Sequence, residues 1–464
     1  MTSPVTNQAF SSLPLAASFI DNLTALEYTQ MTPIQALSLS HILDNKDILA
    51  QAKTGSGKTA AFGIGLLNKL NIQEQSAQAL ILCPTRELAD QVSKEIRLLA
   101  RSVANTKVIS LCGGKPMQAQ LTSLQHPAHV VVGTPGRLLK HLQKGSLQID
   151  KLKTLVLDEA DRMLDMGFYD DIMRIINFTP SKRQTLLFSA TYPEDIIKIS
   201  RSIQTHPIDV SAPDSQEESK IKQLFYEIQK GERASTLKAL LAQYKPKSCI
   251  VFCNRKQQCN ELAEYLWQQG FHAQALHGDL EQKDRDRVLV QFSNMSSSIL
   301  IATDVAARGI DIKDLPLVIN YELAHDPEIH IHRIGRTGRA GKDGIALSLF
   351  MPSETKKIIA IEEYQNGAVK IKKGQSSSSS KHSNLKPSMV TLQISAGRKN
   401  KIRAGDILGA LTANTELNGQ QIGKIDIFDI ISYVAIERSK AKQAFNILNE
   451  NKIKGRKWRV KKLH

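Results

Sequence analysis

Three short segments carry residues suited to nucleotide chemistry, and the first is AKTGSGKT at 52–59. It follows the strand-like run DILAQ and precedes the helical run AAFGIGLLNKL. Gly55 and Gly57 allow backbone N–H groups to close on phosphate oxygens, Lys58 can reach the β- and γ-phosphates, and Thr59 can ligate Mg²⁺. The segment therefore predicts a phosphate-binding loop, with a structural Gly/Ser turn as the alternative. Ala52 stands where the general pattern has Gly.

The second segment is DEAD at 158–161, directly after the apolar run LVL. A carboxylate at a strand tip, here Asp158, can hold the hydration shell of Mg²⁺. Its neighbour Glu159 can orient and deprotonate an attacking water. A solvated acidic turn is the alternative, and the phosphate loop upstream makes it the weaker one.

The third segment, HRIGRTGR at 332–339, concentrates arginines between glycines. Arg336 and Arg339 fall in a later part of the chain than Lys58 and Glu159. If that part is a second domain, hydrolysis would depend on domain closure, as it does with an arginine finger. A plain basic surface loop is the alternative.

Short apolar runs recur along the first 350 residues, and the three segments are expected to be positioned by the strands that these runs form. ALILC, VVV, TLVL and TLLF form one series, and CIVFCN, SILIA, LVINYEL and IALSLF form another. Runs of this length, bounded by turn formers and separated by helix-length stretches, indicate buried parallel strands in βαβ units. Ligands of such sheets bind at the carboxyl ends of the strands, where the unusual segments fall. We expect two doubly wound α/β domains.

Two polar stretches divide the chain. SAPDSQEESK at 211–220 separates the two strand series, and GQSSSSSKHS at 374–383 is typical of a flexible linker. Beyond the linker, four strands are indicated by the runs MVTLQI, IGKIDIF, SYVAI and WRVKK. Two helices are expected from the spacing of apolar residues over 404–411 and 441–448. The predicted order is βαββαβ, a split-βαβ sheet. The expected boundaries are 1–210, 211–373, a linker at 374–384, and 385–464.

Composition narrows the class of protein. The formal charge is +16, and residues 381–464, with 17 Lys and Arg against 6 Asp and Glu, supply +11 of it. Such a surplus favours a polyanionic partner and predicts salt-dependent attachment to nucleic acid. No apolar run approaches the roughly 18 residues of a membrane span, so no membrane association is expected. The five cysteines lie mostly in apolar runs, which predicts reduced thiols, no metal site made of Cys249, Cys253 and Cys259, and a cytoplasmic protein.

Eleven short motifs follow one another over roughly residues 10–350. They are MTPIQ, AKTGSGKT, PTREL, Gly113–Gly114, TPGR, DEAD, SAT, HGD, QKDR, TDVAARGID and HRIGRTGR. In these motifs and in their order the chain resembles the DEAD-box RNA helicases. The resemblance implies two tandem RecA-like domains that clamp ATP and single-stranded RNA, and an RNA-stimulated ATPase that unwinds short duplexes. No obligate protein partner is implied.

The resemblance also implies roles for individual residues. Gln35 would read the adenine, with Tyr28 and Phe10 lining it, although Glu27 stands where the family usually has Gly and Met31 where it usually has Pro. Lys58 and Thr59 would bind phosphates and Mg²⁺, Asp158 would hold Mg²⁺ through water, and Glu159 would be the base. The remaining nucleotide residues would be Ala52, Lys53, Thr54, Gly55, Ser56, Gly57, Asp304, Gly309, Asp311, Arg336 and Arg339. Ser189, Thr191 and His332 would couple the nucleotide and RNA sites.

RNA would lie along both domains, held mainly through phosphates and 2′-hydroxyls. The first domain would use Pro84, Thr85, Arg86, Gly114, Thr134 and Arg137, and the second Arg255, Gly278, Thr303 and Arg308.

The tail, 385–464, resembles the RNA-binding domain of DbpA-type helicases, an RRM-like α+β domain. This resemblance implies recognition of a 23S rRNA hairpin and action on pre-50S particles in large-subunit assembly. An RNA-recognition strand expects K/R-G-F/Y-G/A-F-V-x-F/Y, whereas the corresponding run has Asp429 in place of the cation and Ile431 in place of an aromatic, with Tyr433 kept. We therefore expect binding through basic loops beside the sheet. These carry Arg398, Lys399, Lys401, Arg403, Lys454, Arg456, Lys457 and Arg459.

Three alternatives remain. The basic tail could raise affinity for any RNA, which would make the protein a general RNA helicase or chaperone. The chain could be a non-catalytic RNA-binding scaffold, although Lys58, Glu159, Arg336 and Arg339 are all present. It could also be a DNA-translocating helicase with the same core. The rRNA hairpin, the assembly step, directionality and oligomeric state are not encoded in any motif.

Overall fold

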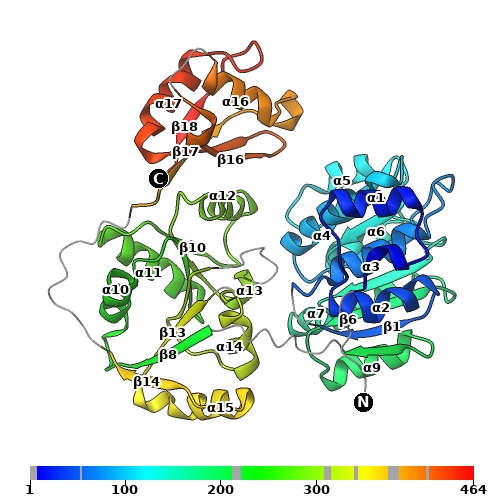
Figure 1. Cartoon of the computed structure of the whole chain (residues 1–464), viewed down its shortest axis with the longest axis horizontal. Helices are drawn as coiled ribbons and strands as arrows, with labels where there is room; N and C mark the ends of the chain where they lie inside the picture. Colours follow the sequence, from blue (N-terminus) through cyan, green and yellow to red (C-terminus); the bar gives the residue numbers. More distant parts are fainter. Residues whose placement is uncertain are drawn as a thin grey trace. The chain divides into compact units, whose positions relative to one another are not determined.

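The computed structural model describes residues 8–52, 55–211, 221–307, 315–338, 343–374, 386–413 and 417–463. They form a first sheet domain (8–211), a second sheet domain (221–374) and a C-terminal domain (386–463), coloured from blue to red in Figure 1. The second sheet domain and the C-terminal domain pack into one compact unit, and the first sheet domain is a unit of its own. The predicted connector and linker lie almost wholly outside the described residues.

The first sheet domain is built on a seven-stranded parallel sheet of order β3-β4-β2-β5-β6-β1-β7. Its strands are β1 Ile48–Gln51, β2 Ala79–Leu82, β3 Val108–Leu111, β4 Val130–Gly133, β5 Thr154–Asp158, β6 Gln184–Ser189 and β7 Ile208–Ser211. Its helices are α1 Ala17–Ala25, α2 Pro33–Leu43, α3 Lys58–Asn68, α4 Arg86–Leu99, α5 Met117–Leu124, α6 Pro135–Gln143, α7 Ala160–Asp165, α8 Tyr169–Ile176 and α9 Glu194–Ile203.

Helices cover both faces of this sheet, which explains why its central strands are apolar throughout. Leu186 of β6 packs with residues of α1 to α4, whereas the next residue, Leu187, packs with residues of α6 to α9. Successive side chains of a strand point to opposite faces, so a strand buried on both faces needs an unbroken apolar run. The runs read from the sequence as buried parallel strands are therefore confirmed.

The second sheet domain repeats the architecture, with a parallel sheet of order β10-β11-β9-β12-β13-β8-β14. Its strands are β8 Ile221–Glu227, β9 Cys249–Phe252, β10 Ala273–Leu276, β11 Ile299–Ala302, β12 Leu317–Asn320, β13 Gly344–Phe350 and β14 Lys370–Lys373. Its helices are α10 Arg233–Tyr244, α11 Lys256–Gln268, α12 Gln282–Ser293, α13 Asp304–Ala307, α14 Pro327–Ile334 and α15 Thr355–Gln365. Leu224 packs with α10 and α11, and its neighbour Phe225 packs with α15.

The C-terminal domain has the predicted βαββαβ order. It consists of β15 Met389–Ile394, α16 Ala404–Thr412, β16 Ile422–Ile427, β17 Ser432–Glu437, α17 Ala441–Glu450 and β18 Val460–Lys462, with an antiparallel sheet of order β16-β17-β15-β18. Leu392 and Val434 of the sheet join Ile407 of α16 and Leu448 of α17 in one core. The last strand starts at Val460, two residues after its predicted start. Ahead of it, Trp458 donates its indole N–H to the carbonyl of Ile453 at 3.3 Å.

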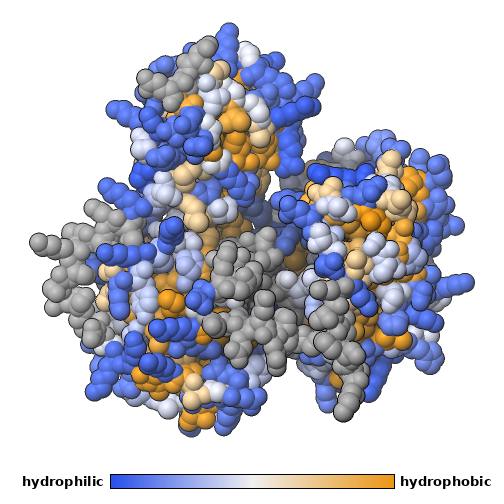
Figure 2. Space-filling view, in the orientation of Figure 1, coloured by the Kyte–Doolittle hydropathy of each residue, from blue (hydrophilic) through white to orange (hydrophobic). Residues whose placement is uncertain are grey.

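All five cysteines are free and buried, as predicted. Within the described ranges, no helix is both long and apolar enough to cross a membrane, and no group of His, Cys, Asp or Glu is arranged to hold a metal ion by itself. The face drawn in Figure 2 is hydrophilic over much of its coloured area, with apolar patches between the polar side chains.

Candidate functional site: a nucleotide edge, an RNA edge and a basic rim

The predicted phosphate loop joins the carboxyl end of β1 to the first turn of α3. Gly55 and Gly57 have φ of +87° and +96°, left-handed conformations that favour glycine. A Cβ at Gly57 would lie 2.5 Å from Nε2 of Gln35, so the position has no room for a side chain. Lys58 is buried, and its ammonium donates to the carbonyl of Ala52 at 2.9 Å across the base of the loop. The loop is thus held in shape by its own lysine; Lys53 and Thr54 lie outside the described residues.

Gln35 ties the predicted adenine motif to this loop. Its side chain accepts from the backbone N–H of Thr32 at 2.8 Å and donates to the carbonyl of Gly57 at 3.0 Å. The hydroxyl of Thr32 donates to the carbonyl of Ser56 at 2.7 Å. Thr32 is absent from the predicted site, although its place before Pro33 at a helix start was a usable signal.

The rest of the adenine motif packs behind Gln35. Phe10 is buried and meets the ring of Tyr28 edge-on, with 6.1 Å between centroids. Burial and then Glu95 raise the pKa of Tyr28 to about 12, which keeps the phenol protonated at neutral pH. Glu27, which replaces the usual Gly of the family, has φ of +64°, so the backbone here keeps the shape that favours glycine.

Asp158 and Glu159 stand at the end of β5, two strands from β1. Both are buried, and Oδ1 of Asp158 has no hydrogen-bond partner within the described part of the chain. Burial raises the pKa of Asp158 to about 7, while Lys58 opposes the shift. The positive charge of Lys58 acts on this carboxyl group, and one of its buried oxygens lacks a hydrogen-bond donor among the described residues. Such an oxygen fits the hydration shell of a divalent cation.

Two further residues of this turn organise the site and are missing from the prediction. Arg162 pairs with Oε2 of Glu159 at 3.1 Å, and both side chains are buried. Asp161 accepts from the backbone N–H groups of Ala190 and Thr191 at 3.1 Å each, and from the hydroxyl of Thr191 at 3.2 Å. Asp161 thereby links the DEAD turn to the SAT segment, where Ser189 donates to the carbonyl of Thr191 at 2.6 Å.

The predicted RNA residues of this domain lie at the ends of a separate group of neighbouring strands. The guanidinium of Arg86 covers Gly114. A Cβ added to Gly114 would lie 1.9 Å from Nη1 of Arg86, so the position has no room for a side chain. Arg137 donates to the carbonyl of Lys115 and to Gln120, at 3.0 Å each. Pro84, Thr85 and Thr134 are buried, with Thr85 capping α4 and Thr134 at the N-cap of α6.

The strand order explains how the two groups are arranged. Neighbours β3, β4 and β2 carry the predicted RNA residues, whereas neighbours β5, β6 and β1 carry the nucleotide residues. All strands are parallel, so both groups lie along one edge of the sheet, and β2 pairs with β5 where they meet. We call these stretches the RNA edge and the nucleotide edge.

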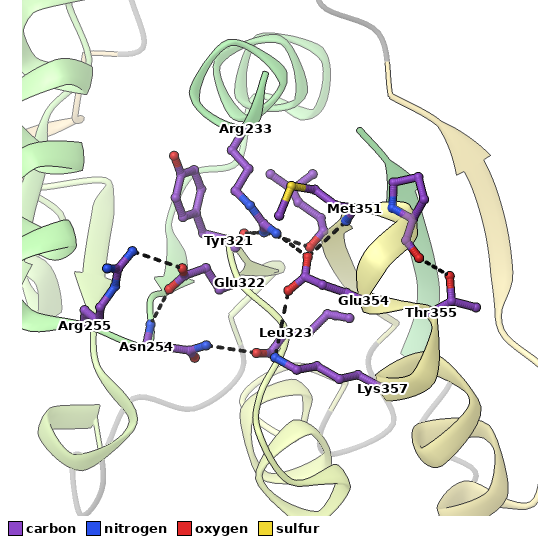
Figure 3. Close-up of polar contacts among 12 residues, drawn as sticks. Arg233, Asn254, Arg255, Tyr321, Glu322, Leu323, Met351, Glu354, Thr355 and Lys357 are labelled. Atoms are coloured by element: carbon purple, nitrogen blue, oxygen red, sulfur yellow. Dashed lines mark hydrogen bonds and ion pairs between the residues drawn. The ribbon is translucent and has the colours of Figure 1, made fainter. Parts of the chain in front are cut away.

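The predicted RNA residues of the second sheet domain that the structure describes lie at the carboxyl ends of β9, β10 and β11, which are also neighbours. Gly278 and Arg255 are exposed there, and Thr303 is buried. Glu322 accepts from the backbone N–H of Asn254 at 2.9 Å and lies 4.0 Å from Arg255, as Figure 3 shows. Figure 3 also shows Arg233 directed at Glu354, an ion pair that fastens α10 to the start of α15.

Arg333, the first arginine of HRIGRTGR, is among the largest fully buried side chains described. It binds both oxygens of Asp304, at 2.6 and 2.8 Å, and donates to Asn254 at 2.8 Å and to the carbonyl of Glu322 at 2.7 Å. The prediction overlooked Arg333, which fixes the predicted nucleotide residue Asp304. Arg336 is buried, and His332 is a partly exposed neighbour of Glu328 at 4.0 Å. Arg308, Gly309, Asp311 and Arg339 lie outside the described residues.

The basic residues predicted in the C-terminal domain lie in two loops at one end of its sheet. The loops follow β15 and precede β18, which are antiparallel neighbours, so they meet. Lys454 donates to the carbonyl of Lys401 at 2.7 Å, and Ser395 donates its N–H to the carbonyl of Arg459 at 3.0 Å. All eight predicted side chains are exposed. We call this set the basic rim: Arg398, Lys399, Lys401, Arg403, Lys454, Arg456, Lys457 and Arg459.

Three family models match the chain, one for each domain. They are the DEAD/DEAH box helicase model over residues 32–199, the helicase conserved C-terminal domain over 232–341, and the DbpA RNA binding domain over 391–462.

Similar proteins cover the chain almost completely. The ATP-dependent RNA helicase DbpA of Escherichia coli K12 is 50% identical over 98% of this chain and 99% of its own length, and that of Bacillus subtilis 168 is 37% identical over the same shares. Among solved structures, S. cerevisiae Dbp5 bound to RNA and ADP BeF3 is 31% identical, with a TM-score of 0.71 over 79% of this chain and 95% of that one. The chain belongs to the DbpA type of DEAD-box ATP-dependent RNA helicases.

Proposed function

We propose that this helicase is directed to 23S rRNA by its basic rim and acts on pre-50S particles in assembly of the large ribosomal subunit. The observation that carries the proposal is the convergence of two separate loops into one exposed rim through Lys454 and the carbonyl of Lys401. Clustered exposed Lys and Arg side chains suit the closely spaced phosphates of a folded RNA hairpin. The proposal includes a cytoplasmic location.

The nucleotide edge supports a division of labour in hydrolysis. Lys58 would contact the β- and γ-phosphates after leaving the carbonyl of Ala52. Glu159 would take the proton of the attacking water, with Arg162 holding its carboxylate in place. Arg336 and Arg339 would supply positive charge as the phosphoryl group transfers. The ion pair with Arg162 would keep the orientation of Glu159, which lowers the cost of reorganisation during the reaction.

Thr59 and Asp158 would hold Mg²⁺, Asp158 through water. The ion would neutralise phosphate charge when bound. The support for this assignment is the unpartnered Oδ1 of Asp158 and the burial that disfavours a bare carboxylate there. Asp161 would pass the state of the DEAD turn to Thr191, one of the residues expected to couple the nucleotide and RNA sites, since hydrogen bonds join the two residues.

The test compares ATPase stimulation by 23S rRNA fragments and by unrelated RNA of equal length, with and without residues 385–464. We expect truncation to remove the preference for rRNA and to leave basal ATPase intact. A truncated chain that still prefers rRNA would place targeting in the sheet domains. An intact chain without any preference would favour the second candidate, a general RNA helicase whose basic rim binds RNA without selectivity.

A further inference from the structure

Three of the expected RNA residues of the first sheet domain follow two neighbouring strands. Gly114 comes after β3, and Thr134 and Arg137 come after β4. The two strands are parallel, with Leu111 beside Gly133, so the segments that follow them leave the sheet side by side. The strand pairing fixes the backbone of both segments, but the long side chain of Arg137 needs contacts of its own to keep one orientation.

Gln120 of α5 supplies such a contact and binds both segments. It is 5% exposed, and its amide nitrogen donates to the carbonyl of Cys112 at 2.8 Å. Its amide oxygen accepts from Nη1 of Arg137 at 3.0 Å, and the same nitrogen of Arg137 donates to the carbonyl of Lys115. These bonds tie the arginine to the backbone on both sides of the Gly113–Gly114 pair.

His141 fixes which way the amide of Gln120 points. It lies one helical turn after Arg137 on α6 and is fully buried. Its Nε2 lies 2.9 Å from the amide oxygen of Gln120, and its Nδ1 lies 2.9 Å from the hydroxyl of Ser146. A carbonyl oxygen can only accept, so Nε2 carries a proton. Burial, and then Arg137 and Lys144, lower the pKa of His141, so the ring is neutral at pH 7.

The held arginine keeps one edge of its guanidinium for a ligand. Both of its bonds use Nη1, whereas Nε and Nη2 form the pair of parallel N–H groups that can bind a phosphate side-on. A side chain that is already held loses less rotamer freedom on binding. We propose that Gln120 is a positioning residue for RNA, because it holds Arg137 in the orientation that presents this edge. The inference rests on the expected role of Arg137 in RNA binding.

A neutral amide suits this role better than a carboxylate would. A carboxylate at position 120 could also hold Arg137, but its negative charge would offset the attraction of the arginine for phosphate. It would also leave the carbonyl of Cys112 without the donor that the amide supplies. Gln120 therefore orients the arginine without weakening its positive charge.

The RNA dependence of ATP hydrolysis in the full chain tests this role, with a single-stranded RNA that lacks ribosomal sequence as the probe. In Gln120→Met we expect the half-stimulating RNA concentration to rise by about five- to tenfold, with KM for ATP and the rate at saturating RNA within about twofold of the parent values. Gln118→Met, the same change at an exposed position of α5, should leave all three unchanged. Equal RNA dependence in the two variants would overturn the proposal.

A double variant shows whether Gln120 acts through Arg137. Arg137→Gln alone should raise the half-stimulating RNA concentration by about tenfold or more, because it removes a charged phosphate contact. Adding Gln120→Met should raise it by less than about twofold further, since no arginine is left to hold. Effects that multiply would overturn the positioning role. An unchanged RNA dependence in Arg137→Gln would refute the RNA role of Arg137 itself, and the proposal with it.

A second variant covers the case in which Gln120→Met does not fold. Gln120→Glu keeps the size of the side chain and an oxygen for Arg137 and His141, so the buried carboxylate stays paired. We expect the half-stimulating RNA concentration to rise by about tenfold in Gln120→Glu and by less than about threefold in Gln118→Glu, which adds the same charge to the exposed side of α5. Equal effects in these two variants would also overturn the proposal.

Discussion

The nucleotide edge and the basic rim differ in how far their charged side chains are buried. At the nucleotide edge, Lys58, Asp158 and Glu159 are buried, with Lys58 bound to the carbonyl of Ala52 and Glu159 paired with Arg162, whereas the rim carries exposed cations on loops. Chemistry needs charged groups whose orientation is fixed before the substrate arrives, and such groups must be desolvated. Attachment to phosphates needs many solvated charges whose effect falls with salt. Replacing one buried residue of the nucleotide edge should therefore affect activity more than replacing one exposed cation of the rim.

The largest effect is expected at the nucleotide edge. Glu159→Gln keeps the side-chain shape and a hydrogen-bonding group beside Arg162 but removes the base, so RNA-stimulated turnover should fall by about 10²- to 10⁴-fold while ATP still binds. Steady-state ATPase and equilibrium nucleotide binding measure the two parts separately. If more than a tenth of the stimulated hydrolysis remains, Glu159 is not the base.

At the rim we expect a smaller effect that depends on salt. Replacing Arg398, Lys399, Lys401 and Arg403 by Gln should reduce the slope of log K against log salt for RNA binding by up to about 3. The matched control replaces four exposed lysines of the sheet domains, Lys94, Lys230, Lys370 and Lys373, and removes the same charge. An equal change in slope for both variants would show that net charge alone, without the rim, governs attachment.

A buried histidine in the second sheet domain should make stability depend on pH, which exposed histidines should not. Burial, and then Arg333, lowers the pKa of His330 to about 4 from 6.5. Between those values the unfolded chain binds the proton and the folded chain does not, so stability falls as pH falls, by about 2 kcal/mol at pH 5. Hydrogen exchange of β12 and β13 should show this loss in the parent chain and in His325→Gln, an exposed control, but not in His330→Gln. Identical pH profiles for the two variants would contradict the assignment.

The smallest effect is expected from the phosphate loop backbone. Gly57→Ala places a Cβ 2.5 Å from Gln35 at a φ of +96°, so ATP affinity should fall by about tenfold. Gly145→Ala is the control, because it also has positive φ, at +65°, but nothing within 4 Å. If both variants lose ATP affinity equally, the contact with Gln35 is irrelevant.

Local patterns predicted the fold, because apolar runs such as TLLF need burial on both faces wherever they occur. They also predicted where Lys58, Asp158 and the rim cations lie. Thr32, Asp161, Arg162 and Arg333 were missed because their roles depend on partners distant in space or on hydrogen bonds between turns. The hydrogen bonds of Thr391 with Asn294 and Ser296 could not be predicted at all. Thr391, Asn294 and Ser296 are ordinary polar residues until folding brings them together across 97 and 95 positions of sequence.

The central claim is that the basic rim makes this helicase selective for ribosomal RNA. The most direct measurement is the RNA concentration that half-stimulates ATP hydrolysis, for a 23S rRNA fragment and for an unrelated hairpin, in the parent chain and in the four-residue rim variant. We predict a value at least about tenfold lower for the fragment in the parent, and no difference between the RNAs in the variant, with basal hydrolysis unchanged. Equal values for both RNAs in the parent, or a preference that survives in the variant, would contradict the account.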